Sequence, residues 1–121
     1  MGITTFQERV ESWLKACFPI AVWSNRAERT HRFVEEALEL AQANGCSRED
    51  ALALVDYVYS RPVGKPDLEV GGVMVTLAAL CSASRINMDD AGDAELKRNW
   101  DRIDTIRAKQ AAKPHGSPLP Q

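Results

Sequence analysis

The segment that most constrains the fold runs from Val70 to Cys81, where Thr76 is the only polar side chain. A helix of this composition is apolar around nearly its whole circumference, so protein must cover it on all sides. A chain of 121 residues has few helices with which to do so. We therefore expect a partner chain to supply part of the cover. The stretch itself is shorter than the roughly 20 apolar residues that cross a bilayer, so we expect no membrane partner.

Signals for helix ends divide the chain into five expected helices, with no strand pattern and no repeat. The first begins with a capping box formed by Thr5 and Glu8 and ends before Pro19. The second spans about 27–43 and stops at Asn44-Gly45, and the third starts at Ser47 and is broken at 61–66. The apolar helix, with Asp67 as its expected N-cap, runs to about residue 84, and the last starts at Asp89 or Asp90 and runs through Ile106. The segment 19–25, which carries Trp23, is expected to be a loop. The prediction is an all-α fold.

Composition narrows the class of protein. With 45% hydrophobic and 26% charged residues, the chain has the make-up of a single soluble domain, which we place at residues 1–112 before a flexible Pro-rich tail at 113–121. A net charge of −2 argues against nucleic acid as a partner. The three cysteines have no C-x-x-C spacing, and Glu8 and Glu11 stand where a signal peptide would be apolar. A cytoplasmic protein is expected.

Acidic residues on two of the expected helices suggest a metal site. Glu35, Glu36 and Glu39 form an E-E-x-x-E cluster, and Glu69 stands at the start of the apolar helix. Carboxylates three or four residues apart project from the same side of a helix and can share a hard divalent cation. Glu69, on a helix that must be buried, needs a counter-charge that such a cation would supply. A solvated acidic face gives the same pattern in the first cluster, so both interpretations stay open.

These residues carry a family resemblance. From about Arg29 to Lys109, the chain resembles the MazG-like all-α nucleoside triphosphate pyrophosphohydrolases, above all the small phage and prophage members. The resemblance rests on the E-E-x-x-E cluster and on the phrase EVGGVMVTLAALC, which begins at Glu69. The second motif of the family is E-x-x-D. Here Gly72 stands where the family has aspartate.

The resemblance implies a helical bundle whose core is completed by oligomerisation, as a homodimer or a dimer of dimers, in a bacterial or phage-infected cytoplasm. It also implies Mg²⁺-dependent hydrolysis of a (d)NTP by water to a (d)NMP and pyrophosphate, with Mn²⁺ as a substitute ion. By the match, Glu36, Glu39 and Glu69 would be metal ligands, and Glu35 a ligand or the residue that orients the attacking water; Glu35 and Glu36 are the catalytic candidates. Asp56 is a second-line candidate for the ligand position vacated at Gly72, or a surface residue.

Candidate substrate contacts come from basic and aromatic side chains. Arg32 lies on the same stripe as the acidic cluster, and Lys97 and Arg98 lie on the last expected helix, where the family places basic residues. All three are candidates to bind phosphate oxygens, and each is equally interpretable as surface charge. Trp23 could stack on a base or cover the core between the first two helices.

Two other functions remain open from the sequence. The loss of aspartate at Gly72 would fit a catalytically weakened nucleotide-binding or regulatory protein of the same fold. A plain helical dimerisation module with solvated acids is the other. Binding of Mg²⁺ with nucleotide would distinguish the enzyme and the regulatory protein from the dimerisation module. Turnover would distinguish the enzyme from the regulatory protein.

Overall fold

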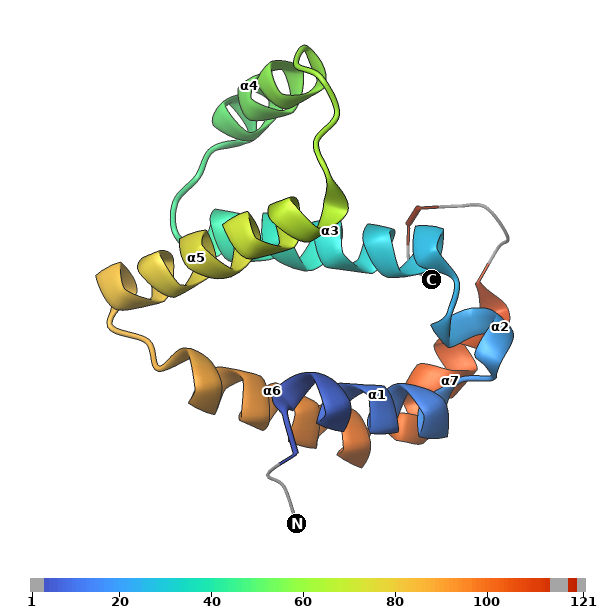
Figure 1. Cartoon of the computed structure of the whole chain (residues 1–121). Coiled ribbons are helices and arrows are strands. Elements are labelled where there is room, and N and C mark those ends of the chain that lie inside the picture. The colour runs from blue at the N-terminus through green and yellow to red at the C-terminus, as the bar shows by residue number, and fades with distance from the viewer. Residues whose placement is uncertain (1–3, 114–117, 120–121) are drawn as a thin grey trace. The chain divides into compact units, whose positions relative to one another are not determined.

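A computed structural model describes residues 4–113 and 118–119. Within these residues the chain forms helices and no strand, which confirms the all-α class (Figure 1). The helices are α1 (Phe6–Cys17), α2 (Ile20–Trp23), α3 (Arg26–Ala43), α4 (Arg48–Tyr59), α5 (Pro66–Ser84), α6 (Met88–Asp101) and α7 (Ile103–Ala112). They divide between two compact units, and α3 passes from one to the other. Unit 1 comprises Met1–Val34 and Asp89–Gln121, and unit 2 comprises Glu35–Met88.

Several predicted helix ends are confirmed. The Thr5 hydroxyl accepts a hydrogen bond from the Glu8 N–H at 3.1 Å, and the Glu8 carboxylate accepts one from the Thr5 N–H at 3.2 Å, which completes the capping box of α1. The Ser47 hydroxyl caps α4 by accepting from the Asp50 N–H at 3.1 Å. At the end of α3, Gly45 adopts a φ of 85°, a left-handed conformation that costs glycine little.

The predicted loop at 19–25 is wrong, because the short helix α2 lies within it. The Pro19 carbonyl accepts hydrogen bonds from the N–H groups of Val22 at 2.9 Å and Trp23 at 3.1 Å. Pro19 has a φ of −65°, which suits a residue that leads into a helix. The proline that ends α1 therefore also begins the next turn.

The start and length of the apolar helix also differ from expectation. α5 begins at Pro66, and Lys65 rather than Asp67 is its N-cap, without a side-chain hydrogen bond. Proline suits the first position because no N–H is needed there. The helix ends at Ser84, as predicted, and Arg85 follows in a left-handed conformation. With 19 residues, α5 as a whole passes the length and composition of a membrane-spanning helix, a test that the core helix of a soluble protein also passes. The expected absence of a membrane partner stays a prediction.

The last predicted helix is divided in two. α6 begins at Met88, close to the predicted start, and ends at Asp101. Arg102, with a φ of −110° and ψ of 20°, separates it from α7. Neither glycine nor proline marks this break in the sequence. It allows α7 to pack beside α1 within unit 1 (Figure 1).

The core of the described chain lies in unit 1. Trp13, Cys17, Phe18 and Leu96 are its buried apolar residues, and the rings of Trp13 and Phe18 meet edge to face at 5.8 Å. Around them pack partly buried side chains from α1, α2 and α7: Val10, Leu14, Val22, Trp23, Ile103 and Ile106. An ion pair of 2.8 Å between Arg9 and Asp93 links α1 to α6. One unit thus packs its own small apolar core.

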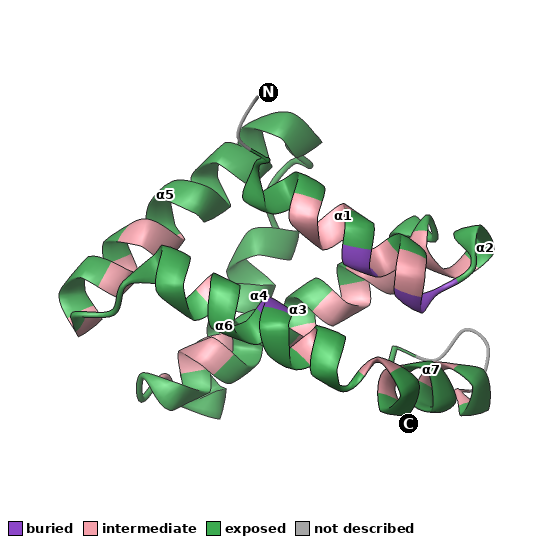
Figure 2. Cartoon of the chain, turned by 90° about the horizontal axis from the view of Figure 1, so that it is seen from below, coloured by how far each residue is buried: buried purple, intermediate pink, exposed green. Residues whose placement is uncertain are grey.

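Unit 2 contains no buried residue in the described chain, and Figure 2 shows α4 and α5 exposed or intermediate along their lengths. Figure 1 shows α4 standing away from α5, joined to it by the loop 60–65. On α5, the exposed fractions reach 58% for Val70, 62% for Met74 and 71% for Val75. The helix that requires the most cover has no buried residue.

Candidate functional site

All four acidic residues singled out for metal binding lie in unit 2. Glu35 is half-buried and Glu36 and Glu39 are exposed, all three on the part of α3 that belongs to this unit. Glu69 is exposed in the first turn of α5. Its carboxylate lies against the preceding loop, since a Cβ placed on Gly64 would be 2.6 Å from Glu69 Oε1. The fold thus puts the acids on two helices of one unit.

The acids are suitable Mg²⁺ donors by chemistry, but the described residues do not gather them. No group of three or more His, Cys, Asp or Glu side chains in this part of the chain lies close enough to hold a metal ion. Glutamate oxygens are the hard donors that Mg²⁺ prefers, and two of them at i and i+3 are provided by Glu36 and Glu39. Glu69 would have to approach this pair to complete a three-carboxylate set.

The position at which the family has aspartate is open. Gly72 has no atom within 4 Å of where a Cβ would be, so an aspartate side chain would fit there. The Gly72 carbonyl accepts a hydrogen bond from the Thr76 hydroxyl at 2.9 Å, which gives that hydroxyl an acceptor within its own helix. Asp56, the second-line ligand candidate, is exposed on α4. Its role as a ligand stays a prediction.

The basic candidates Lys97 and Arg98 lie on α6 in unit 1 and pair with acids of the same helix. Lys97 lies 3.2 Å from Asp101, and Arg98 pairs with Glu95. Both are exposed and belong to the kind of surface pair that contributes little to stability. They are available to a ligand only at the loss of these partners. Their contact with substrate stays a prediction.

The other two substrate candidates already have protein contacts in unit 1. Arg32 donates to the Pro118 carbonyl, and its Nε lies 3.5 Å from the carboxylate of Glu28. Trp23 packs against the core from α2, and the Lys15 ammonium lies 5.5 Å from the centre of its ring. Of the two roles expected for Trp23, stacking on a base or covering the core, this packing corresponds to the second. Stacking on a base would require the Lys15 ammonium to move aside.

The charged cluster around Glu28 is a feature that the sequence analysis missed. Glu28 Oε1 pairs with Lys113 and lies 3.7 Å from Arg29, in addition to its contact with Arg32. The side chains of Lys113 and Glu28 are only 7% and 12% exposed. The spacing of Glu28, Arg29 and Arg32 on one helix was the available signal, but Lys113 comes from the far end of the sequence.

Burial and neighbouring charges shift the pKa values of Glu28, Arg29 and Cys17 in opposite directions. Burial of the Glu28 carboxyl opposes its ionisation, but the hydrogen bond and charge of Lys113, with the charges of Arg32 and Arg29, hold its pKa below the ordinary value. Burial lowers the pKa of Arg29, partly offset by Glu28. Burial also raises the pKa of the Cys17 thiol against the opposing charges of Arg107 and Arg29, so this cysteine is a poor nucleophile.

Comparisons of the chain with models of known protein families, with curated proteins and with solved structures found no match.

Proposed function

We propose that the protein is a Mg²⁺-dependent nucleotide pyrophosphohydrolase of the MazG-like type, which converts a (d)NTP to a (d)NMP and pyrophosphate. The observation that supports the proposal is the presence in one unit of the E-E-x-x-E cluster on α3 and of Glu69 on α5. Both motifs fall in the unit that leaves its apolar side chains exposed. A site completed by a second copy of the chain would need metal-binding acids in a unit whose apolar side chains a partner can cover.

The residues have distinct proposed roles. Glu36, Glu39 and Glu69 would hold Mg²⁺, which when bound neutralises charge on the phosphate oxygens. Glu35 orients the attacking water and accepts its proton, a role for which its half-buried position is suitable. Arg32, Lys97 and Arg98 supply charge-assisted hydrogen bonds to the phosphates.

A homodimer, or a dimer of dimers, is part of the proposal. Exposed apolar side chains continue over α4 and α5, and an apolar surface of this kind is typical of an obligate interface. Burial in a partner's surface would also draw the Glu69 carboxylate out of water. A buried carboxylate requires a counter-charge, which favours its approach to a cation shared with Glu36 and Glu39.

The direct test is pyrophosphate release from a panel of NTPs and dNTPs, with and without Mg²⁺. The proposal predicts release from at least one nucleotide that depends on the metal, with the monophosphate as the second product. Mn²⁺ should replace Mg²⁺ in part. Absence of release from the whole panel, with metal-dependent nucleotide binding retained, would instead favour the regulatory function.

Gly72 is the observation that favours this second candidate, a nucleotide-binding or regulatory protein with weakened catalysis. Gly72→Asp separates the two because the position has space for the new side chain. If the vacant ligand position limits the enzyme, the substitution should tighten Mg²⁺ binding and maintain or raise turnover. If another group such as Asp56 already fills the position, the added acid should lower turnover by crowding.

A further inference from the structure

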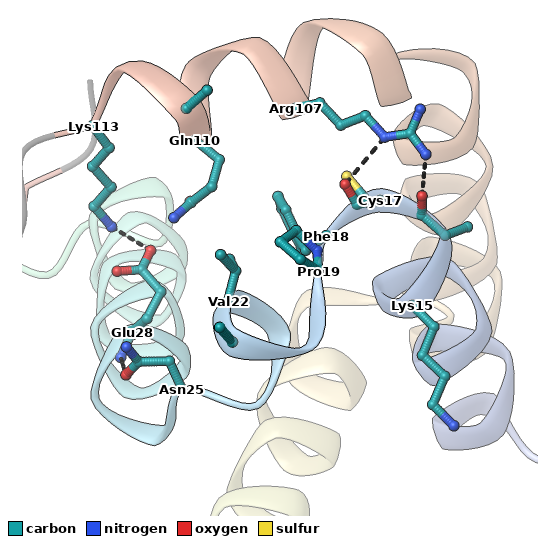
Figure 3. Close-up of a pocket in the computed structure, with 13 residues that line it drawn as sticks. Lys15, Cys17, Phe18, Pro19, Val22, Asn25, Glu28, Arg107, Gln110 and Lys113 are labelled. Atoms are coloured by element: carbon teal, nitrogen blue, oxygen red, sulfur yellow. Dashed lines mark hydrogen bonds and ion pairs between the residues drawn. The ribbon is translucent and has the colours of Figure 1, made fainter.

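The most exposed of the large apolar side chains of α5 lie on one side of the helix. Val75 and Leu68 are 71% and 66% exposed, and they stand one heptad apart, which puts them on the same side. The pocket of about 800 Å³ in unit 1 differs from this surface, because its charged side chains have partners within the chain, as Lys113 has in Glu28 (Figure 3). On this side of α5, in contrast, apolar groups remain in contact with water.

Small residues continue the same side of the helix. Residues that alternate at spacings of three and four form a seam against which a second helix can pack. We define the α5 seam as the residues that follow this spacing: Leu68, Gly71, Val75, Ala78 and Ser82. All of them are exposed except Ala78, which is half-buried. The α5 seam is therefore open along most of the helix.

The other side of α5 turns toward its own chain. Its half-buried residues include Leu77, Cys81 and Ser84. Ser84 Oγ donates a hydrogen bond of 3.1 Å to Asn44 Oδ1, just after the end of α3. The helix thus has an inner side within the chain, and the α5 seam is its outer side.

Gly71 lies in the seam although nothing within the described chain requires a glycine there. No described atom lies within 4 Å of where its Cβ would be, and its φ is not positive. Glycine in the interior of a helix is destabilising relative to alanine. The close approach of a second helix would account for the missing side chain.

Opposite charges stand at the two ends of the seam. Asp67 is in the first turn of α5, and Arg85 is its C-cap. Arg85 has a φ of 57°, in the left-handed region where glycine is usual, so an arginine side chain is kept there at a cost to the backbone. Two antiparallel α5 helices would bring each Arg85 next to the Asp67 of the other copy. A parallel pair would bring like charges together, which is unfavourable.

We propose that α5 pairs antiparallel with α5 of a second copy of the chain along the α5 seam. The inference rests on the homodimer of the proposed function, and it names the surface and the direction through which that homodimer forms. A twofold axis midway between Val75 and Ala78 makes the pairing isologous, so each Val75 packs on the Ala78 of the other copy. Gly71 then faces Ser82 of the other copy, and these small residues let the two backbones approach closely.

Leucine substitutions at the two adjacent glycines of α5 test the surface. Gly71→Leu puts a bulky side chain into the seam and should weaken association of the full-length chain by about 100-fold or more, measured as a dissociation constant by sedimentation equilibrium. Gly72→Leu is the matched control, because this position is equally open within the described chain but lies about 100° around the helix from Gly71, off the seam. It should change the dissociation constant by less than about threefold. Circular dichroism should show both variants to be helical, since both positions have space within the chain.

Charge reversal tests the direction of the pairing. Arg85→Glu and Asp67→Arg should each weaken association about tenfold, because each puts like charges together on both sides of the twofold axis. The double variant restores opposite charges and should return the dissociation constant to within about threefold of wild type. A parallel pair predicts no such rescue.

Three results would overturn the proposal. These are equal weakening by the two glycine variants, no rescue in the double charge reversal, or a monomeric wild type. A monomer that binds phosphatidylcholine vesicles would assign the seam to a lipid surface instead.

The association measurements are separable from the proposed activity, because none of the seam residues is a proposed metal ligand. A protein that releases pyrophosphate but fails these tests would contradict the pairing alone. A dimer that passes them but releases no pyrophosphate would contradict the hydrolysis and leave the pairing in place.

Discussion

Unit 1 and unit 2 differ in how they accommodate their apolar side chains. In unit 1, α1 places Trp13 and Cys17 on one face, and α6 and α7 cover that face with Leu96 and their partly buried residues. In unit 2, the described residues include no buried side chain, although α5 is the most apolar helix of the chain. A helix with one apolar stripe can be satisfied by one neighbour, whereas a helix apolar all round requires several.

The two units also differ in how far their charged side chains are buried. In unit 1, Lys113 and Glu28 form a nearly buried ion pair between segments distant in sequence. Of the candidate acids of unit 2, Glu36, Glu39 and Glu69 are exposed and Glu35 is half-buried. Unit 1 thus has the characteristics of a scaffold that is complete within one chain. Unit 2 leaves apolar side chains exposed, which the proposed second copy would cover.

The largest expected effect is on turnover. Glu39→Gln removes the negative charge of a proposed Mg²⁺ ligand while it preserves side-chain size, so the proposed pyrophosphate release should fall by about 100-fold or more. The far-UV circular dichroism spectrum should be unchanged because Glu39 is exposed. Glu49→Gln is the control, an exposed acid on α4 outside the cluster. Equal Mg²⁺ affinity in wild type and Glu39→Gln would mean that the acids are a solvated face.

A charge placed on α5 should have the next largest effect. Leu77→Asp puts an unpaired carboxylate on the helix that we expect to be covered by a second copy, which costs several kcal/mol of association or folding free energy. Analytical ultracentrifugation should show dissociation, or thermal melting should show unfolding. Val63→Asp, in the loop before α5, should have little effect. An unchanged mass and melting temperature for Leu77→Asp would show that α5 faces water in the assembly.

Unit 1 should respond to loss of its central acid. Glu28→Gln removes the partner of Lys113 and should lower the free energy of unfolding by about 2 kcal/mol at neutral pH, measured by urea denaturation. Glu95→Gln, at an exposed pair on α6, should change it by less than about 0.5 kcal/mol. Similar losses in the two variants would show that burial does not strengthen the Glu28 pair.

The lowered pKa of Glu28 predicts that the stability of the protein depends on pH. The pKa of Glu28 is lower in the folded protein than its ordinary value of 4.5, so its contribution to stability is complete above that value. The contribution is lost as the pH falls through the lower folded pKa. Wild type should therefore lose more stability than Glu28→Gln between pH 5 and strongly acidic conditions. Parallel stability profiles for the two proteins would contradict the assigned direction of the shift.

The end of α3 should show the smallest effect. Gly45 has a φ of 85°, so Gly45→Ala should lower the free energy of unfolding by about 1 kcal/mol, and Gly45→Asn by less. Amide hydrogen exchange should show lower protection of the last turn of α3 in the alanine variant than in wild type. Equal protection in the alanine variant and wild type would mean that the turn tolerates a side chain.

Local signals in the sequence predicted most helix ends correctly. The Thr5 and Glu8 capping box, the Ser47 cap and the left-handed Gly45 depend on residues within a turn of one another, so a short pattern contains the needed information. α2 was missed because Pro19 both ends one helix and precedes another. The break at Arg102 was missed because packing of α7 on α1, rather than a breaker residue, accompanies it.

The candidate site was predictable only in part. Helical spacing correctly put Glu36 and Glu39 on one helix and Glu69 on another. It did not predict the position of Glu69 against the loop at Gly64, which depends on how α5 begins. The pairing of Lys113 with Glu28 joins two ends of the chain, and no local pattern encodes such a contact.

The mass of the wild-type protein in solution tests the central claim, that unit 2 is completed by a second copy of the chain. Light scattering on a size-exclusion column at micromolar concentration should give a dimer or tetramer of the 13.4 kDa chain. Assembly should persist in high salt, because the exposed side chains that would form the interface are largely apolar. A stable monomer under these conditions would contradict the claim, and with it the site that assembly is proposed to complete.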